Sequence, residues 1–126
     1  MILVDTSVWI NHLREGEPAL SALLDQNLVL AHPWVVGELA LGQLRDRDGV
    51  LALLTGLPQA TVATTDEVLS LTSHERLYGS GIGYVDAQLL ASTRLTQDSV
   101  VWSLDRHLVA VAKRLGVAFE APREVS

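Results

Sequence analysis

The chain has 126 residues, a net charge of −6 and no cysteine, and 48% of its residues are hydrophobic. This length fits one domain that spans residues 1–126, and the apolar content is too high for a disordered chain. The lack of cysteine excludes a disulfide framework, a thiolate nucleophile and a cysteine metal site, while the acidic balance argues against passive binding of phosphate by a basic surface.

Short apolar runs alternate with helical patterns along the whole chain. Strands are predicted at residues 2–4, 28–31, 61–63, 100–103 and, from a weaker pattern, 117–119. Helices are predicted at residues 7–14, 18–26, 33–44, 49–54, 65–78, 84–96 and 106–115. Strands that alternate with helices, and that are apolar on both faces, indicate a parallel sheet covered on both sides. We therefore expect an α/β fold, a three-layer α/β/α domain with a parallel sheet of about five strands.

The first strand runs directly into a carboxylate, in the segment MILVDTSVWINHLR. Asp5, Thr6 or Ser7 could cap the helix that follows, which is a structural role. Alternatively, Asp5 lies at the carboxyl end of a central strand, where open α/β sheets place their ligands. The segment alone favours the cap.

Glu38 is the only charged residue in the apolar helix predicted at residues 33–44. A lone buried carboxylate is costly unless it is paired or binds a metal. Two interpretations stay open at this point. Glu38 either pairs with an arginine from elsewhere in the chain or belongs to a site.

Two further acids stand at the ends of apolar segments. Asp86 falls in the first turn of an apolar helix, where the helix dipole favours an ionised acid and a structural role is common. Asp105 repeats the opening pattern, since it follows the apolar run Val100–Trp102 and precedes a helix. Each acid has a structural explanation by itself. Together the four predict a cluster of oxygen ligands for a hard divalent cation such as Mg²⁺.

Four motifs resemble those of PIN domains, and more narrowly those of VapC toxins from bacterial type II toxin–antitoxin modules. They are LVDTS at residues 3–7, GEL at 37–39, VDAQLLA at 85–91 and SLDRHL at 103–108. The resemblance covers nearly the whole chain, and the acids follow in the expected order. The family often has threonine where Ser103 stands and an aromatic residue where Leu108 stands.

The resemblance implies an endoribonuclease toxin that depends on Mg²⁺ or Mn²⁺ and cleaves RNA with a metal-activated water. It implies an acidic catalytic site of Asp5, Glu38, Asp86 and Asp105, in which Asp5, Asp86 and Asp105 bind or support the metal and Glu38 orients or deprotonates the water. Ser7 and Ser103 would be auxiliary polar groups. The implied partners are a VapB-like antitoxin, an RNA substrate and a second copy of the chain in a homodimer.

Other interpretations stay open from the residues alone. A PIN domain could bind RNA or protein without cleavage. A phospho-receiver is disfavoured because Asp5 has no acidic neighbour, and a haloacid-dehalogenase-like phosphatase because Ser7 stands where a second aspartate is needed. Arg106 and His107 adjoin Asp105, so either could contact phosphate.

The start of the chain gives no sign of export. It lacks a basic region, and its apolar run at residues 2–4 is too short for a signal peptide. No stretch approaches the roughly 18 apolar residues of a membrane span. We therefore expect a cytoplasmic protein that does not bind a membrane.

Overall fold

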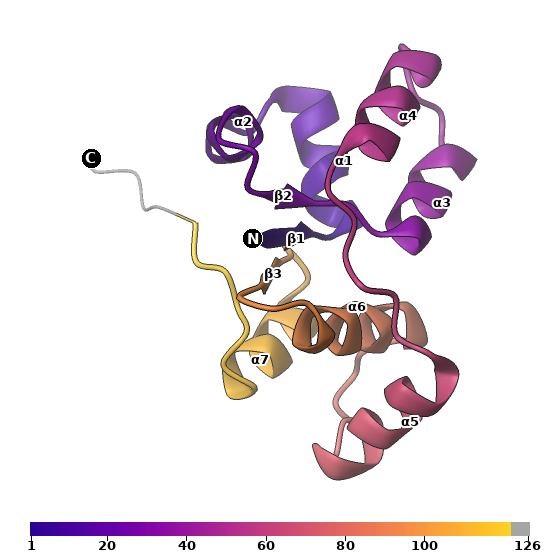
Figure 1. The fold of residues 1–126 in the computed structure, drawn as a ribbon, viewed down its shortest axis with the longest axis vertical. Helices are drawn as coiled ribbons and strands as arrows, with labels where there is room; N and C mark the ends of the chain where they lie inside the picture. The colour runs from indigo at the N-terminus through magenta and orange to yellow at the C-terminus, as the bar shows by residue number, and fades with distance from the viewer. Residues whose placement is uncertain (122–126) are drawn as a thin grey trace.

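A computed structural model describes residues 1–121 of the chain, so the last five residues of the expected domain lie outside the described part. Three strands and seven helices follow one another there (Figure 1). In chain order they are β1 (Ile2–Val4), α1 (Thr6–Glu15), α2 (Pro18–Asp25), β2 (Val29–Leu30), α3 (Pro33–Leu41), α4 (Arg47–Gly56), α5 (Thr65–His74), α6 (Tyr84–Leu95), β3 (Val100–Trp102) and α7 (Arg106–Arg114).

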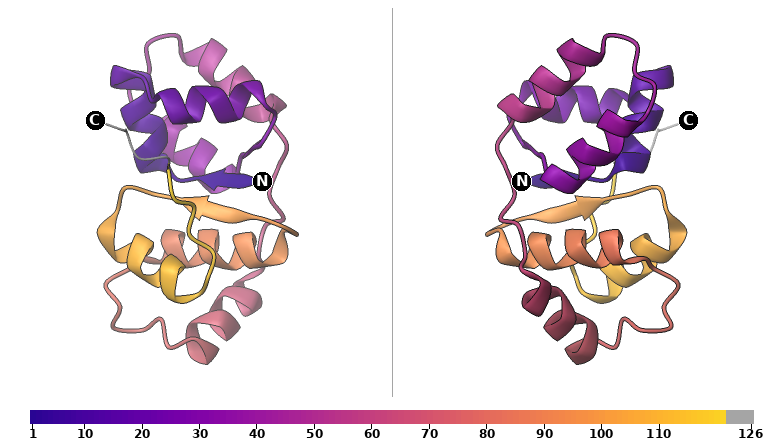
Figure 2. Two further views of the ribbon diagram at one scale, coloured as in Figure 1. Left: turned by 90° about the vertical axis from the view of Figure 1, so that its left-hand side faces the viewer. Right: turned by 90° about the vertical axis from the view of Figure 1, so that its right-hand side faces the viewer.

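The strands form a parallel sheet in the order β2-β1-β3, so β1 occupies the centre. Ile2 pairs with Val29 on one side and with Val100 on the other. The sheet lies between two groups of helices, α1–α4 on one side and α5–α7 on the other (Figures 1 and 2). This arrangement agrees with the expected helix–sheet–helix layers.

The sheet is narrower than the five strands expected. Within residues 1–121 it has three strands, and each outer position is reduced to a single parallel bridge, Ala31 to Gln59 and Val101 to Ala118. The predicted strand at residues 117–119 therefore survives only as a contact of Ala118 with Val101. At the other edge the bridge falls at Gln59, two residues before the predicted strand at 61–63.

Residues 61–63 do not form a strand because side chains of α6 and of its C-cap residue Thr96 take their backbone hydrogen bonds. The backbone N–H of Ala63 donates to Gln88 Oε1 and to Ser92 Oγ, both at 3.1 Å, and Gln88 Nε2 donates to the carbonyl of Ala63 at 3.0 Å. The N–H of Thr61 donates to Thr96 Oγ1. Because these backbone N–H and C=O groups already bond to side chains, they cannot also form strand-to-strand hydrogen bonds.

Three helices differ from the predicted bounds by two or more residues at an end, and the other four differ by one residue. Helix α3 ends at Leu41 rather than residue 44, because Gly42 is extended and its N–H turns back to the carbonyl of Leu39. Helix α5 ends at His74 rather than residue 78, because Arg76 takes a left-handed conformation with φ 52°. Helix α4 is longer than predicted and begins after Asp46, whose side chain accepts from the N–H of Gly49.

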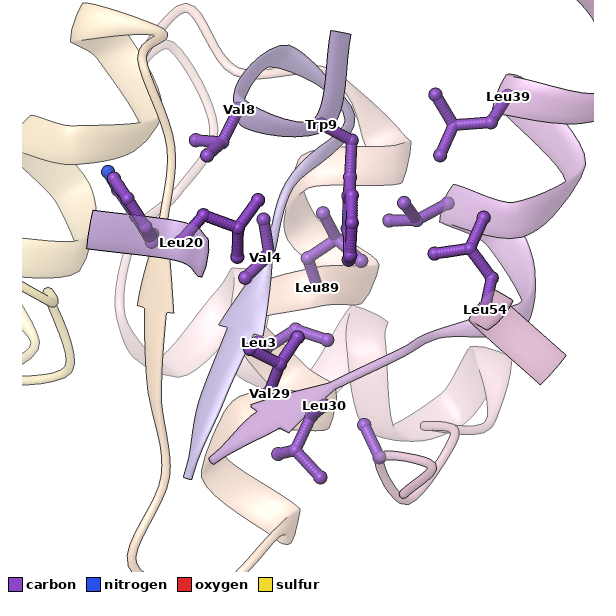
Figure 3. Packing of buried hydrophobic residues seen from close by; sticks show 13 residues of the cluster. Leu3, Val4, Val8, Trp9, Leu20, Val29, Leu30, Leu39, Leu54 and Leu89 are labelled. Atoms are coloured by element: carbon purple, nitrogen blue, oxygen red, sulfur yellow. The ribbon is translucent and has the colours of Figure 1, made fainter. Parts of the chain in front are cut away.

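The larger core cluster joins the sheet to α1–α4 (Figure 3). Trp9 of α1 is fully buried and lies between the strand residue Val4 and the side chains of Leu39 and Leu54. Leu89 extends this cluster to α6. Burial of a side chain as large as Trp9 contributes about 3 kcal/mol to folding, which fixes α1 against the end of β1. None of the helices in residues 1–121 is both long and apolar enough to cross a membrane.

A buried polar network links the beginning of α3 to the middle of α6. His32 is fully buried, and its Nδ1 accepts from the N–H of Trp34 at 3.1 Å as the N-cap of α3. Because Nδ1 is an acceptor, Nε2 carries the proton and donates to Ser92 Oγ at 3.0 Å. Ser92 in turn donates to Gln88 Oε1 at 2.7 Å. Only a neutral imidazole can make both contacts of His32.

Burial lowers the pKa of His32, and the nearby Gln88 side chain offsets part of this effect. At acidic pH His32 therefore binds a proton more readily in the unfolded chain than in the folded chain. Its contribution to stability is complete above the ordinary histidine pKa of about 6.5 and decreases as the pH falls toward the lower pKa of the folded state. We predict that the free energy of unfolding decreases between pH 7.5 and pH 5. His32→Asn, which can still cap α3, should flatten this dependence.

Urea unfolding at a series of pH values measures the effect, with His74→Asn as the control because His74 is exposed. An unchanged slope in His32→Asn would show that other groups cause the acid sensitivity.

Candidate active site

Asp5 is both a helix cap and the buried acid at the carboxyl end of β1. Its Oδ1 accepts from the N–H of Thr6 at 2.8 Å, which begins α1, and only 6% of the residue is exposed. The ladder continues to this point, because the N–H of Asp5 donates to the carbonyl of Trp102. The two interpretations of Asp5 are thus compatible, since a cap at this position also stands at the edge where α/β sheets bind ligands.

Two serine hydroxyls hold the other oxygen of Asp5. Ser7 Oγ and Ser103 Oγ donate to Oδ2 at 2.9 and 2.7 Å. Each hydroxyl also accepts a backbone N–H beyond β3, Ser7 from Leu104 and Ser103 from Asp105, both at 3.0 Å. The carboxylate therefore joins the end of β1 to the end of β3.

Asp105 repeats the capping role of Asp5 at the end of the neighbouring strand. Its Oδ1 accepts from the N–H groups of His107 and Leu108 at 2.9 and 3.1 Å, which begins α7. Asp105 is exposed, and His107 Nδ1 lies 3.8 Å from its Oδ1. Because β1 and β3 are parallel neighbours, the two acids meet at one edge of the sheet.

Glu38 lies at this edge too, but it is not buried as its apolar surroundings in the sequence predicted. Thr6 Oγ1 donates to Glu38 Oε1 at 2.9 Å, directly after Asp5. The residue is exposed because this face of α3 points to solvent, as Trp34 and Leu41 also do. Because Glu38 is exposed, its charge does not need an ion-pair partner or a metal to offset a cost of burial.

Asp86 stands in the first turn of α6 and is half-buried. Burial raises the pKa of its carboxyl, and nearby negative charges raise it further, while the backbone N–H of Gly83 lowers it. The charges that raise the pKa of Asp86 belong, in decreasing order, to Asp5, Asp105 and Glu38. All three other acids thus act on Asp86, as like charges that share a site do.

The four acids fit a hard divalent cation by their chemistry but do not form a preformed cage. Within residues 1–121 no group of three or more acidic or histidine side chains is arranged to hold a metal ion. No lysine or arginine of that part forms an ion pair with them either, since its one such pair joins Arg94 to Glu75. Carboxylate oxygens with uncompensated charge are the donors that Mg²⁺ and Mn²⁺ prefer. A shared ion would require the side chains to draw closer.

Sequence reasoning did not identify Thr6 as a contact of the site. It contacts Glu38 through its hydroxyl, and its N–H contacts Asp5. The signal was present, because Thr6 is the middle residue of the polar run Asp5-Thr6-Ser7, but that pattern also describes an ordinary helix start. Only the packing of α3 beside α1 shows that Thr6 contacts the acidic site as well as beginning a helix.

The fold and this acidic edge agree with the comparison to known families. The PIN domain model matches residues 2–114, and the chain belongs to the PIN-domain family. Ribonuclease VapC32 of Mycobacterium tuberculosis, in both the CDC 1551 and H37Rv strains, is 49% identical over 118 residues, which cover 94% of this chain and 95% of that protein. Within the PIN-domain family, this similarity places the chain with the VapC proteins. This excludes the phospho-receiver and phosphatase interpretations.

Solved structures support the same fold. One is a structure of FitAB bound to an IR36 DNA fragment, with a TM-score of 0.63 and 21% identity, in which 94% of this chain matches 92% of the other. FitAcB from Neisseria gonorrhoeae also gives a TM-score of 0.63, with 23% identity and coverage of 94% and 95%. PAE2754 from Pyrobaculum aerophilum gives 0.57, with 18% identity and coverage of 87% and 78%.

We predict that Asp86→Asn stabilises the protein in the absence of metal. The raised pKa of Asp86 means that ionising it costs folding energy at neutral pH. The neutral amide removes one repelling charge and keeps the shape. The gain should be a few tenths of a kcal/mol to about 1 kcal/mol, reduced because the carboxyl is partly solvated and because an acid in a first turn is itself favourable.

Thermal melts in EDTA and in millimolar Mg²⁺ measure this effect. A cation that binds only the folded state should raise the wild-type midpoint more than that of the variant. A variant that melts lower in EDTA would mean that Asp86 acts mainly as a favourable first-turn acid.

Proposed function

We propose that this chain is an endoribonuclease that depends on Mg²⁺ or Mn²⁺ and acts as the toxin of a VapBC-type module. The observation that carries the proposal is the meeting of Asp86 with three carboxylates whose charges act on it at the carboxyl edge of the sheet, in a chain 49% identical to Ribonuclease VapC32. The PIN and VapC family is typically metal-dependent. A PIN domain that binds RNA or protein without cleavage remains the alternative.

The roles follow from how each acid is held. Asp5 keeps one orientation because two serine hydroxyls and one backbone N–H fix its oxygens, so with Asp86 it is our first choice for a metal ligand. Asp105 completes or supports this pair. Glu38 is exposed beside Thr6, which supports a role in orienting a water or accepting its proton. A bound divalent cation would make that water more acidic and offset charge on the phosphate.

A groove beside Glu38 supports the proposal of an antitoxin partner. It has a volume of about 460 Å³ and lies between α1, α3 and α4. Its walls include the exposed apolar residues Ile10 and Leu13, together with Arg14 and Glu38. An antitoxin segment with apolar side chains and one basic group would fill this groove and approach the acids.

The remaining proposals concern the state of the protein in the cell. We propose one domain over residues 1–126, a homodimer, and a cytoplasmic location without membrane binding. Several apolar side chains on the helices face solvent, among them Leu41, which is 92% exposed, and Leu53. Exposed side chains of this kind support an interface with another chain, although single ones are common on monomers.

We predict that the purified protein cleaves RNA only with Mg²⁺ or Mn²⁺ and leaves 5′-phosphate and 3′-hydroxyl ends. The sequence places no pair of histidines beside the acids that could activate the 2′-hydroxyl of RNA. Asp86→Asn should lose cleavage by at least 100-fold, because it removes an anionic ligand. Sequencing of RNA 5′ ends after induction identifies both the ends and the target. Cyclic-phosphate products, or full activity in excess EDTA, would contradict the mechanism.

We also predict that expression of this chain alone arrests growth of its host and that the protein encoded beside it relieves the arrest. Ile10→Arg should keep the arrest but weaken the relief, because it places a charge in the apolar wall of the groove. The matched control is Leu69→Arg, an exposed position on α5 outside the groove. Harmless expression, or no relief by the neighbour, would disprove the toxin assignment.

A further inference from the structure

Helix α7 concentrates positive charge in a chain that is acidic overall. It holds three of the nine lysine and arginine residues and no acidic residue, although the net charge of the chain is −6. Arg106, Lys113 and Arg114 are all exposed. Within residues 1–121, none of them forms an ion pair with a carboxylate. Their charges are therefore available to a partner.

A hollow runs along the same helix. It has a volume of about 430 Å³ and is lined by Ser80, Arg106, His107, Ala110, Val111 and Arg114. The loop after α5 forms its other wall. Gly81, at φ 89°, lies so close to the His107 ring that a Cβ there would stand 2.7 Å from Cδ2. The loop thus packs directly against the start of α7.

We propose that this hollow is a binding track for the phosphate backbone of the RNA substrate, on the side of the acids where α7 begins. The proposal rests on the proposed ribonuclease function. Arg106 follows the acid Asp105 directly, and Arg114 stands eight residues further along the helix. Eight residues correspond to about 12 Å, a length that several nucleotides cover. The track would lead the strand away from the acidic edge.

An acidic protein that binds RNA needs positive charge beside its acidic edge. RNA carries one negative charge per nucleotide, and both the whole chain and the acidic edge repel it. A row of cations beside the edge lowers that repulsion where the strand must approach. Arginine suits the role because its planar fork can hold a phosphate with two hydrogen bonds. Phosphate contacts position a strand without reading its bases, so sequence selection would lie elsewhere.

A purely structural role for these side chains makes a different prediction. Lys113 and Arg114 occupy the last turn of α7, where cations stabilise the helix dipole by about 0.3–1 kcal/mol. That role would be visible in the melting temperature and not in RNA binding. Arg106 stands in the first turn, where a cation is unfavourable for the dipole, so the dipole does not explain its position.

The test compares Arg106→Gln, Arg114→Gln and the double variant with wild type. On host RNA, the single variants should raise KM about 3- to 10-fold and the double variant more, with kcat changed less than twofold. In an Asp86→Asn background, binding of labelled single-stranded oligoribonucleotides gives the salt dependence. Each lost contact should reduce the slope of log Kd against log salt by about 0.7, and the loss should be equal for unrelated sequences.

Arg94→Gln is the matched control, because it removes one positive charge from the far end of α6, where Arg94 pairs with Glu75. Its KM and salt slope should match those of wild type. Arg114→Lys should keep most of the binding that Arg114→Gln loses, since lysine keeps the positive charge. Equal loss in Arg94→Gln would show a general charge effect and overturn the track.

The outcomes separate this inference from the function beneath it. If the wild-type protein does not cleave RNA with added metal, the proposed function fails first. If it cleaves and the α7 variants keep wild-type KM and salt slope, the track is wrong and the function stands. If the variants lose relief by the antitoxin and keep RNA binding, α7 is a protein interface, which also overturns the proposal.

Discussion

One carboxylate oxygen organises the edge of this sheet. Asp5 Oδ2 accepts from Ser7 and Ser103, and these hydroxyls accept backbone N–H groups from the segment that follows β3. The ends of two parallel strands are thereby fixed to each other by side chains at the point where the backbone ladder stops. Charge-assisted hydrogen bonds of this kind are about twice as strong as neutral ones, so the position of Asp5 is well determined before any ligand binds.

The fold uses its acids twice. Asp5 and Asp105 begin α1 and α7 as N-caps, so removal of either would cost helix stability as well as chemistry. Asp86 and Glu38 serve no comparable structural purpose in holding the strands. Asp86 is instead destabilised in its ionised form by burial and by its neighbours. The edge therefore combines two acids that also cap helices with two that do not, and bound positive charge would offset the repulsion that acts on Asp86.

The distribution of charge extends this division across the molecule. The acids meet at the carboxyl edge, whereas α7 leaves that edge with three cations and no acid. Under the proposed ribonuclease function, a polyanion must reach a negative site, and the cations of α7 would attract it on the adjacent surface. The groove beside Glu38, which mixes apolar and charged side chains, lies between α1, α3 and α4 and is separate from the cationic hollow along α7. The two surfaces have different chemistry and suit different partners.

The sequence by itself determined the class of fold, the seven helices in order and three of the five expected strands, because apolar runs and cap residues are local signals. It also singled out the four acids, since each interrupts an apolar pattern. Tertiary structure decided what local pattern cannot encode. Residues 61–63 became a bridgeless segment because Gln88 and Ser92 took their hydrogen bonds, and Glu38 became exposed because one face of an apolar helix points to solvent. The buried bond of His32 to Ser92 likewise joins residues 60 positions apart, which only packing can bring together.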